Sequence, residues 1–577
     1  MGFHAPVRDI VFSLEVAGLK DLLASFPDLD SDTCTQVLTA AGEFAEGVLA
    51  PLNRSGDLEG ARFENGRVFT APGFADAYHQ FIDGGWTSLA APPEFGGQGL
   101  PRAIALAVFD MVTAANMSFG LCPMLSEAAI HLLTKHGTPR QQQVYLPRIV
   151  SGQWTGTMNL TEAQAGSDLA LIRTRAEPDG DKYRVTGQKI FITWGDHDCA
   201  ENIIHLVLAR LPDAPPGTKG ISLFLVPKRL PDADGKPGVA NSLRPLSIEH
   251  KLGIHASPTC VMSYEGAEAE LVGAPHQGLA LMFTMMNAAR LNVGAQGVGI
   301  AERAYQQARD YALERRQGRS SWSDDIPARI FDLPDVRRTL LLMKAKTEAA
   351  RAICFSTAIA ADLSEHASTP DRREAAKLRE ELLVPVAKAW STDIGVEMAS
   401  LGIQVHGGAG FIEETGAAQF YRDARIAPIY EGTNGIQAID LVGRKLSLAG
   451  GGAVRALLTE MRATLADLDP AVAASLREAI AATERATDWL VEARGSPDAL
   501  AGATDYLKLL GDTTGGWLLA KGALAASRGS DTGNARGRLA LARIFATQVL
   551  ASTPGLADAV QVGARELQAG AAALSAD

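Results

Sequence analysis

The feature of this sequence that most constrains its fold is a change of hydrophobic period, which occurs twice along the chain. Apolar residues recur at helical spacing up to about residue 154. Residues 155–275 instead alternate apolar and polar side chains between glycine-containing turns, which is typical of strands. The helical period then returns. A β segment between helical segments favours separate layers over an alternating α/β sheet. We therefore expect a mainly α protein with an inserted β domain.

Three long stretches with helical period follow the β segment, at 282–319, 336–363 and 373–403. Together with the apolar pattern after Thr433, they predict a four-helix bundle. A glycine-rich joint at 447–453 then precedes an alanine-rich helical segment. The predicted domains are a helical N-terminal domain (1–154), an antiparallel, β-barrel-like middle domain (155–275), a helical bundle (276–446) and an additional helical domain (454–577).

Composition excludes several functional classes. The formal net charge of -12 disfavours non-specific binding to nucleic acid or to an anionic membrane. The five cysteines form no C-x-x-C pair and have no histidine at ligand spacing, so neither a structural zinc site nor a disulfide framework is expected. We find no convincing signal peptide and no uncharged apolar segment of about 18 residues. These features predict a cytoplasmic protein without a metal site.

A nicotinamide-dependent enzyme of the usual kind is also not supported. No strand, G-x-G-x-x-G loop and helix follow one another as a dinucleotide-binding unit would require. The glycine-dense loop that stands out, Val405–Gly410, lies between helical segments instead.

Glu431 poses a separate question, because a carboxylate there stands between Tyr430 and Gly432 at the start of a helical pattern. The simple interpretation is that Glu431 complements the positive end of that helix, with Thr433 or Asn434 as the cap. The alternative is a catalytic role, and this stretch alone leaves both open.

Five motifs occur together in order along the chain. They are P-E-F-G-G-Q-G-L-P from Pro93, T-E-x-x-A-G-S-D from Thr161, G-Q-K-x-F-I-T from Gly187, Q-V-H-G-G-x-G from Gln404, and R-D-A-R-I-x-x-I-Y-E-G-T-N ending at Asn434. In this combination the chain resembles the acyl-CoA dehydrogenase family over about residues 60–446. The segment after residue 453 resembles the larger subgroup that carries a C-terminal helical extension.

The resemblance implies FAD-dependent α,β-dehydrogenation of an acyl-CoA thioester. Glu431 would remove the α proton, with Arg290 behind its carboxylate, while the β hydrogen leaves as hydride to flavin N5. Residues implied to contact FAD are Met158, Leu160, Thr161, Ser167, Phe191, Thr193, Arg315, Gln404, Gly408 and Thr433. Residues 316–319 depart from the family pattern, so no adenine-side contact is assigned there.

The resemblance also implies substrates and partners. The acyl group is 3-methylmercaptopropionyl or a medium or long fatty chain, electron-transfer flavoprotein is the expected electron acceptor, and a homodimer is favoured over a tetramer. Two interpretations of the extension stay open: it covers an apolar face of the bundle and limits assembly, or it closes a long acyl tunnel.

Two rival functions follow from the same motifs. An acyl-CoA oxidase would share the fold and the base but pass electrons to molecular oxygen. A flavin-binding relative that associates with nucleic acid without turnover would need a basic surface. The extension instead carries acidic residues throughout and has no run of lysine or arginine, which disfavours that second rival.

Overall fold

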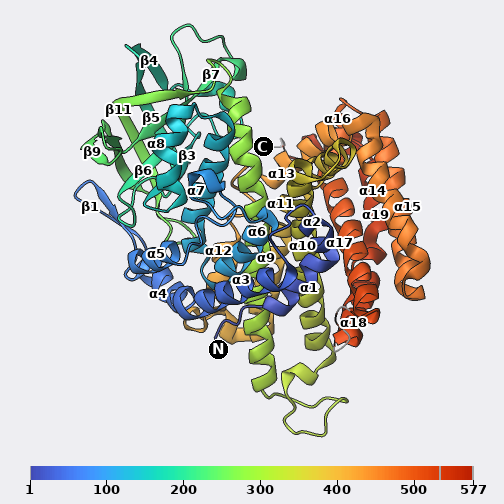
Figure 1. The fold of residues 1–577 in the computed structure, drawn as a ribbon. Coiled ribbons are helices and arrows are strands. Elements are labelled where there is room, and N and C mark those ends of the chain that lie inside the picture. The colour runs from blue at the N-terminus through green and yellow to red at the C-terminus, as the bar shows by residue number, and fades with distance from the viewer. Residues whose placement is uncertain (1, 530, 532–533, 575–577) are drawn as a thin grey trace. The chain divides into compact units, whose positions relative to one another are not determined.

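The computed structural model describes residues 2–529, 531 and 534–574, and it divides into two compact units. The first, which we call the helical unit, comprises Met1–Glu43, Leu106–Ala114 and Arg290–Asp577. The second, the β-containing unit, comprises Phe44–Ala105 and Ala115–Ala289. Helices α3 (Ser31–Phe44), α6 (Arg102–Ala115) and α9 (Gly278–Glu314) contribute residues to both units. Figure 1 labels these helices and many of the other elements named below.

The β-containing unit is built around a seven-stranded sheet. Its strands are β3 (Trp154–Asn159), β4 (Arg175–Asp179), β5 (Lys182–Thr193), β6 (Asn202–Arg210), β7 (Ile221–Pro227), β10 (Leu243–Ile248) and β11 (Thr259–Val272). Pairing runs from β11 through β5, β4, β6 and β7 back to β11, so the sheet closes on itself as the predicted barrel-like domain requires. Most pairs are antiparallel, but β3 and β4 each pair with β6 in parallel, which the sequence prediction missed.

Apolar side chains on one face of the strands fill the interior of this sheet. Val185, Val207, Phe224 and Met262 are all buried in one apolar cluster, as expected where one strand face is turned away from water. The remaining elements of this unit are α4 (Pro51–Glu59), β1 (Arg62–Glu64), β2 (Arg67–Phe69), α5 (Phe74–Asp83), α7 (Met117–His136), α8 (Pro139–Val150), β8 (Arg229–Pro231) and β9 (Pro237–Ala240).

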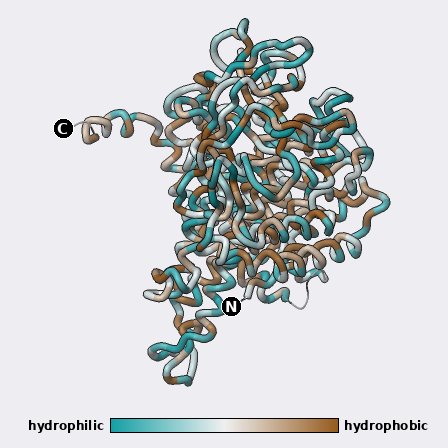
Figure 2. Tube along the Cα trace, turned by 90° about the vertical axis from the view of Figure 1, so that its left-hand side faces the viewer, coloured by the Kyte–Doolittle hydropathy of each residue, from teal (hydrophilic) through white to brown (hydrophobic). Residues whose placement is uncertain are grey.

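The helical unit contains α10 (Pro334–His366) and α11 (Pro370–His406), which pack along one another and follow α9. Teal and brown stretches alternate along the helices in Figure 2, as in helices that have a polar and an apolar face. The prediction of a fourth long helix after Thr433 is wrong, because the helix there is short. It is α13 (Asn434–Asp440), only 7 residues, continued by a short π-helical turn at Leu441–Lys445.

The other helices of this unit lie before and after the bundle segment. They are α1 (Val7–Ala17), α2 (Leu19–Leu23), α12 (Ala417–Ala424), α14 (Gly452–Thr464), α15 (Pro470–Glu492), α16 (Pro497–Ala501), α17 (Ala503–Ser527), α18 (Ala535–Gln548), α19 (Thr553–Gln561) and α20 (Arg565–Gly570).

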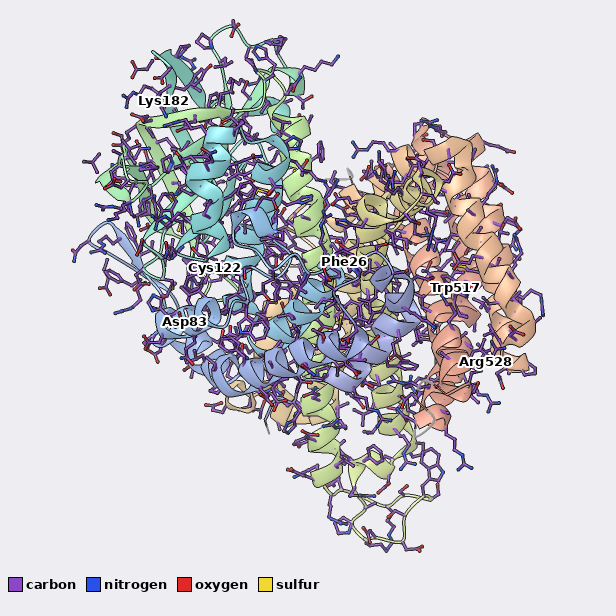
Figure 3. All side chains as sticks on the ribbon, viewed as in Figure 1. Phe26, Asp83, Cys122, Lys182, Trp517 and Arg528 are labelled. Atoms are coloured by element: carbon purple, nitrogen blue, oxygen red, sulfur yellow. The ribbon has the colours of Figure 1, made fainter. Side chains whose placement is uncertain are left out.

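The C-terminal extension packs on the bundle through α17, which contacts both α10 and α11. Gly511 allows this approach, because a Cβ there would lie 2.4 Å from a ring atom of Trp390. The Trp390 indole N–H donates to Asp512 Oδ1 at 2.9 Å. Trp517, labelled in Figure 3, is buried on the same helix. This packing fits the interpretation that the extension covers a face of the bundle.

Among the described residues, one helical stretch, Ala535–Gln561, is long and apolar enough by composition to be a candidate membrane span. This stretch is weak evidence for a membrane span, because it is not one continuous helix. Helix α18 ends at Gln548 and α19 begins at Thr553. The Arg538 side chain within it is buried and ion-paired with Asp9 at 2.6 Å.

Candidate active site

Glu431 lies in the turn between α12 and α13, and its backbone is strained. Its φ angle is 55°, and that of Gly432 is 85°. A left-handed conformation is unusual for a residue with a side chain, and such strain concentrates at functional sites. Gly432 tolerates it, and a Cβ at that position would lie only 2.7 Å from Gln437 Nε2. Thr433, not Asn434, caps α13, with its Oγ1 accepting from the Ile436 N–H at 3.2 Å.

The charges around Glu431 come from two long helices. Arg290 of α9 is buried and donates from Nε to the backbone carbonyl of Glu431 at 3.4 Å, and Gln437 Nε2 donates to the same oxygen at 3.5 Å. Removal of the carboxylate from water raises the pKa of Glu431 to about 7, although Arg290 and Lys388 both act to lower it. Desolvation therefore has a larger effect on this pKa than the two cations. The sequence alone could not show which of these effects is larger.

A second group of predicted residues lies where β3 and β5 end in the β-containing unit. The Thr157 hydroxyl donates to the Thr193 carbonyl at 2.8 Å, and the Ile190 N–H donates to the Thr161 carbonyl at 2.9 Å. These bonds bring Met158, Leu160 and Thr161 beside Phe191 and Thr193.

Phe191 differs from an ordinary core aromatic. Its side chain is 59% exposed, and its φ angle is 60°. Trp194, three residues further on, is buried instead. An exposed, strained aromatic beside two threonine hydroxyls suits a flat, apolar ring system with polar edges, so these residues fit the isoalloxazine ring of FAD. Ser167 is exposed in the loop that follows Thr161, where a hydroxyl could reach a phosphate.

The residues predicted to hold the other end of FAD lie in the helical unit. Arg315 follows the end of α9, Gln404 is in the last turn of α11, and Gly408 lies in the short 3-10 turn Gly407–Phe411. All three are exposed, and Phe411 beside them is 86% exposed. The structure thus groups Glu431, Arg290 and Thr433 in the helical unit, and the five flavin-ring residues in the β-containing unit.

Four domain models of one family match the chain in order. The acyl-CoA dehydrogenase N-terminal domain matches residues 31–153, the middle domain 157–267 and the C-terminal domain 276–446. An acetyl-CoA dehydrogenase C-terminal-like domain matches 457–569.

The chain belongs to the acyl-CoA dehydrogenase family. It is an FAD-dependent acyl-CoA dehydrogenase, and the extension matches a domain found within this family.

Two curated relatives cover nearly the whole enzyme. It is 48% identical over 569 residues to 3-methylmercaptopropionyl-CoA dehydrogenase of Ruegeria pomeroyi, covering 95% of this chain and 96% of the relative. It is 32% identical to a broad-specificity linear acyl-CoA dehydrogenase of Mycobacterium tuberculosis, with 95% of each chain covered.

Solved structures show the same fold. The dehydrogenase aligns with ACDH-11 of Caenorhabditis elegans in complex with C11-CoA at a TM-score of 0.79 and 23% identity, over 95% of this chain and 92% of that one. An acyl-CoA dehydrogenase of Bacillus anthracis complexed with FAD aligns at a TM-score of 0.75 and 20% identity, over 93% and 89% of the two chains.

Sequence reasoning missed a buried ion pair that anchors the loop after β3. Lys189 Nζ donates to Glu162 Oε1 at 2.8 Å and to the Leu160 carbonyl at 2.9 Å. Burial alone would raise the pKa of Glu162, but Lys189 and hydrogen bonds from Thr174 and the Arg173 N–H lower it to about 2. The available signal was a lysine inside a strand, directly before the apolar run Ile190–Ile192, since a buried lysine needs a carboxylate partner.

Proposed function

We propose that the enzyme oxidises 3-methylmercaptopropionyl-CoA or a fatty acyl-CoA to the 2-enoyl-CoA, with Glu431 as the base that removes the α proton. The observation that carries the proposal is the strained turn at Glu431, where desolvation raises the pKa of the carboxylate to about 7. A general base works best when its pKa lies near the working pH. The 48% identical relative named for 3-methylmercaptopropionyl-CoA supports this choice of acyl group.

An aliphatic α C–H is a very weak acid, so the base needs help. Hydrogen-bond donors directed at the thioester oxygen stabilise the enolate as the proton leaves, and loss of one such donor typically costs about 3 kcal/mol. The backbone N–H of Glu431 is the donor we propose from this chain, and Gly432 gives the substrate close access to it. Arg290 binds the Glu431 carbonyl, in the next peptide group, and so restrains the turn that carries this N–H. FAD held by the residues assigned below would supply the hydride acceptor for the β hydrogen.

The FAD contacts are part of this proposal. Ring contacts are assigned to Met158, Leu160, Thr161, Phe191 and Thr193, and Thr433 is assigned to FAD. Ser167 is assigned to the pyrophosphate. Arg315, Gln404 and Gly408 are assigned to the tail of FAD. All three residues are exposed, which supports an FAD-tail site that a second subunit completes.

The pH dependence of catalysis follows from the raised pKa of Glu431. Below about pH 7 the carboxylate is protonated and cannot accept the α proton. We therefore expect kcat/KM to rise about tenfold per pH unit through the acid range and to level off above about pH 7. Steady-state rates between pH 5 and pH 9 provide the measurement. A profile already level at about pH 5, as an ordinary glutamate with a pKa near 4.3 would give, would contradict the assignment.

The substrate is tested best with an isosteric pair. Pentanoyl-CoA matches 3-methylmercaptopropionyl-CoA in length, with a methylene in place of sulfur, and octanoyl-CoA and palmitoyl-CoA extend the series. We expect kcat/KM to be highest for the two short isosteres and to fall for the longer chains. The kcat/KM values of the two isosteres should differ by no more than about 200-fold, because such a small apolar difference is worth only about 1–3 kcal/mol. A maximum at palmitoyl-CoA would exclude the short substrate and favour the acyl-tunnel role of the extension.

The electron acceptor, assembly and location complete the proposal. Electron-transfer flavoprotein is the proposed acceptor. This choice is supported by a chain from a solved structure of the electron-transferring flavoprotein of Acidaminococcus fermentans, which aligns at a TM-score of 0.59 and 27% identity. We propose a cytoplasmic homodimer acting in β-oxidation-type metabolism. All five cysteines are free and buried, which suits a reducing compartment. We also propose that the chain has four domains, with the bounds 1–154, 155–275, 276–446 and 454–577.

A further inference from the structure

A second cation lies close to Glu431 and has no role in the mechanism above. Lys388 is on α11, and none of its side chain is exposed. Its Nζ donates to Asn434 Oδ1 at 2.8 Å. Asn434 is the first residue of α13, three positions after Glu431.

The Asn434 amide connects this turn to α11 at several points. Its Nδ2 donates to Asp393 Oδ1 at 2.8 Å, to Thr392 Oγ1 at 3.0 Å and to the Ala389 carbonyl at 3.1 Å. All of these acceptors, like Lys388, belong to two turns of one helix. The Asn434 side chain therefore fixes the segment that carries Glu431 to α11, and Lys388 supplies a cationic contact to that side chain.

The charges that act on Glu431 come from the helices packed around it. Arg290 of α9 and Lys388 of α11 both favour its anionic form. Asp393 of α11 and Glu431 in turn favour the charged form of Lys388, whereas burial and Arg290 oppose it. Asp440 of α13 and Arg444 act on Arg290, and Arg425 and Lys508 act on Asp393. Burial, the largest of these effects, lowers the pKa of Lys388 to about 7.

One of the residues that Asn434 contacts borders a cavity. Asp393, at the other end of the Asn434 bridge, lines a cavity of about 490 Å³ beside α11 and α12. The other residues that line it include Glu397, Ser400, Tyr421 and Arg425.

We propose that Lys388 is a positioning residue for the base: through Asn434 its ammonium group holds the 431–434 turn on α11, and its charge keeps the Glu431 carboxylate anionic. This inference rests on the proposed role of Glu431. Glu431 and Lys388 titrate as a coupled pair, so the acid limb of the pH profile belongs to both groups.

Two substitutions separate the charge of Lys388 from its hydrogen bond. Lys388→Gln removes the charge and keeps a donor for Asn434, whereas Lys388→Met removes both. In each variant we expect the acid limb of the kcat/KM profile to move to higher pH by about one unit, because an opposite charge nearby lowers a carboxylate pKa by roughly that amount or more. At acidic pH this shift appears as an about tenfold lower kcat/KM. Lys388→Arg, which keeps the charge, should restore the limb towards its original position.

Lys346→Met is the matched control. Lys346 is also buried, on α10, and its Nζ donates to Glu397 at 2.7 Å, one turn beyond Asp393. Its loss should leave the acid limb unchanged. Bound FAD per chain and the thermal unfolding midpoint are measured for every variant, so that a general loss of structure is recognised.

The outcomes distinguish this inference from the function on which it rests. If Glu431→Gln abolishes activity but the acid limb stays within about 0.2 pH units in both neutral Lys388 variants, the positioning role is overturned and the base is retained. If Glu431→Gln stays fully active, the base assignment itself fails. Should both Lys388 variants lose FAD, Asn434→Ala takes their place: a shifted limb supports the inference, and an unshifted limb overturns it.

Discussion

Replacing Glu431 with glutamine is expected to slow substrate-dependent flavin reduction by about 10⁴-fold, the upper end of what a positioned base contributes. The amide keeps nearly the volume of the carboxylate but cannot accept the α proton at neutral pH. No described hydrogen bond that fixes the turn uses the carboxylate, because Arg290 and Gln437 both bind the backbone carbonyl. The variant should therefore fold and stay yellow. Stopped-flow absorbance of the flavin under anaerobic conditions measures the rate constant.

Glu397→Gln is the control for this change. Glu397 is a carboxylate on α11 that pairs with Lys346 at 2.7 Å, and its side chain is 42% exposed. Its conversion to an amide should leave flavin reduction within about twofold of the original rate. A Glu431→Gln enzyme that reduces its flavin at a comparable rate would show that another group takes the proton.

The largest expected effect on stability comes from Arg351, at the centre of a buried ion network in the helical unit. Its guanidinium, which is not exposed at all, pairs with Asp110 at 2.7 Å, Glu348 at 2.9 Å and Glu302 at 3.2 Å. Arg351→Met would remove the cation paired with Asp110 and would leave Glu302 and Glu348 paired with Lys344. We expect the free energy of unfolding to fall by about 3–5 kcal/mol, as when one partner of a buried pair is removed. The midpoint of denaturant-induced unfolding, followed by circular dichroism, reports this loss.

Arg338→Met provides the comparison on the same helix. Arg338 pairs with Asp335, whose side chain is 83% exposed, so this surface pair should contribute less than about 1 kcal/mol. If Arg351→Met unfolds at the same denaturant concentration as Arg338→Met, the network does not stabilise the helical unit as we infer.

The sequence predicts the helical and β layers because hydrophobic period depends directly on side-chain direction. It did not predict the parallel pairing of β3 with β6, since strand alternation carries no information on strand direction. The short α13 was missed for a related reason. Ile439 continues the apolar pattern after Thr433, yet 44% of it is exposed, and a π turn begins at Leu441.

Charged residues were the main obstacle to predicting the site and the core. Arg351 and Lys388 lie on helices where a charge normally indicates a solvated face, and both are fully buried. Each has a partner that is distant in the chain: Asp110 lies 241 residues from Arg351, and Asn434 lies 46 residues from Lys388. Glu431 could be found because it stands in a specific motif. Its raised pKa could not, because desolvation depends on packing.

An anaerobic titration of the purified, flavin-containing enzyme with 3-methylmercaptopropionyl-CoA tests the central claim most directly. The account predicts that the visible flavin absorbance bleaches in proportion to the acyl-CoA added, with one 2-enoyl-CoA formed per flavin reduced. The isosteric pentanoyl-CoA should bleach it as well. An enzyme that retains FAD but bleaches with neither compound nor with any longer acyl-CoA would contradict the proposed reaction.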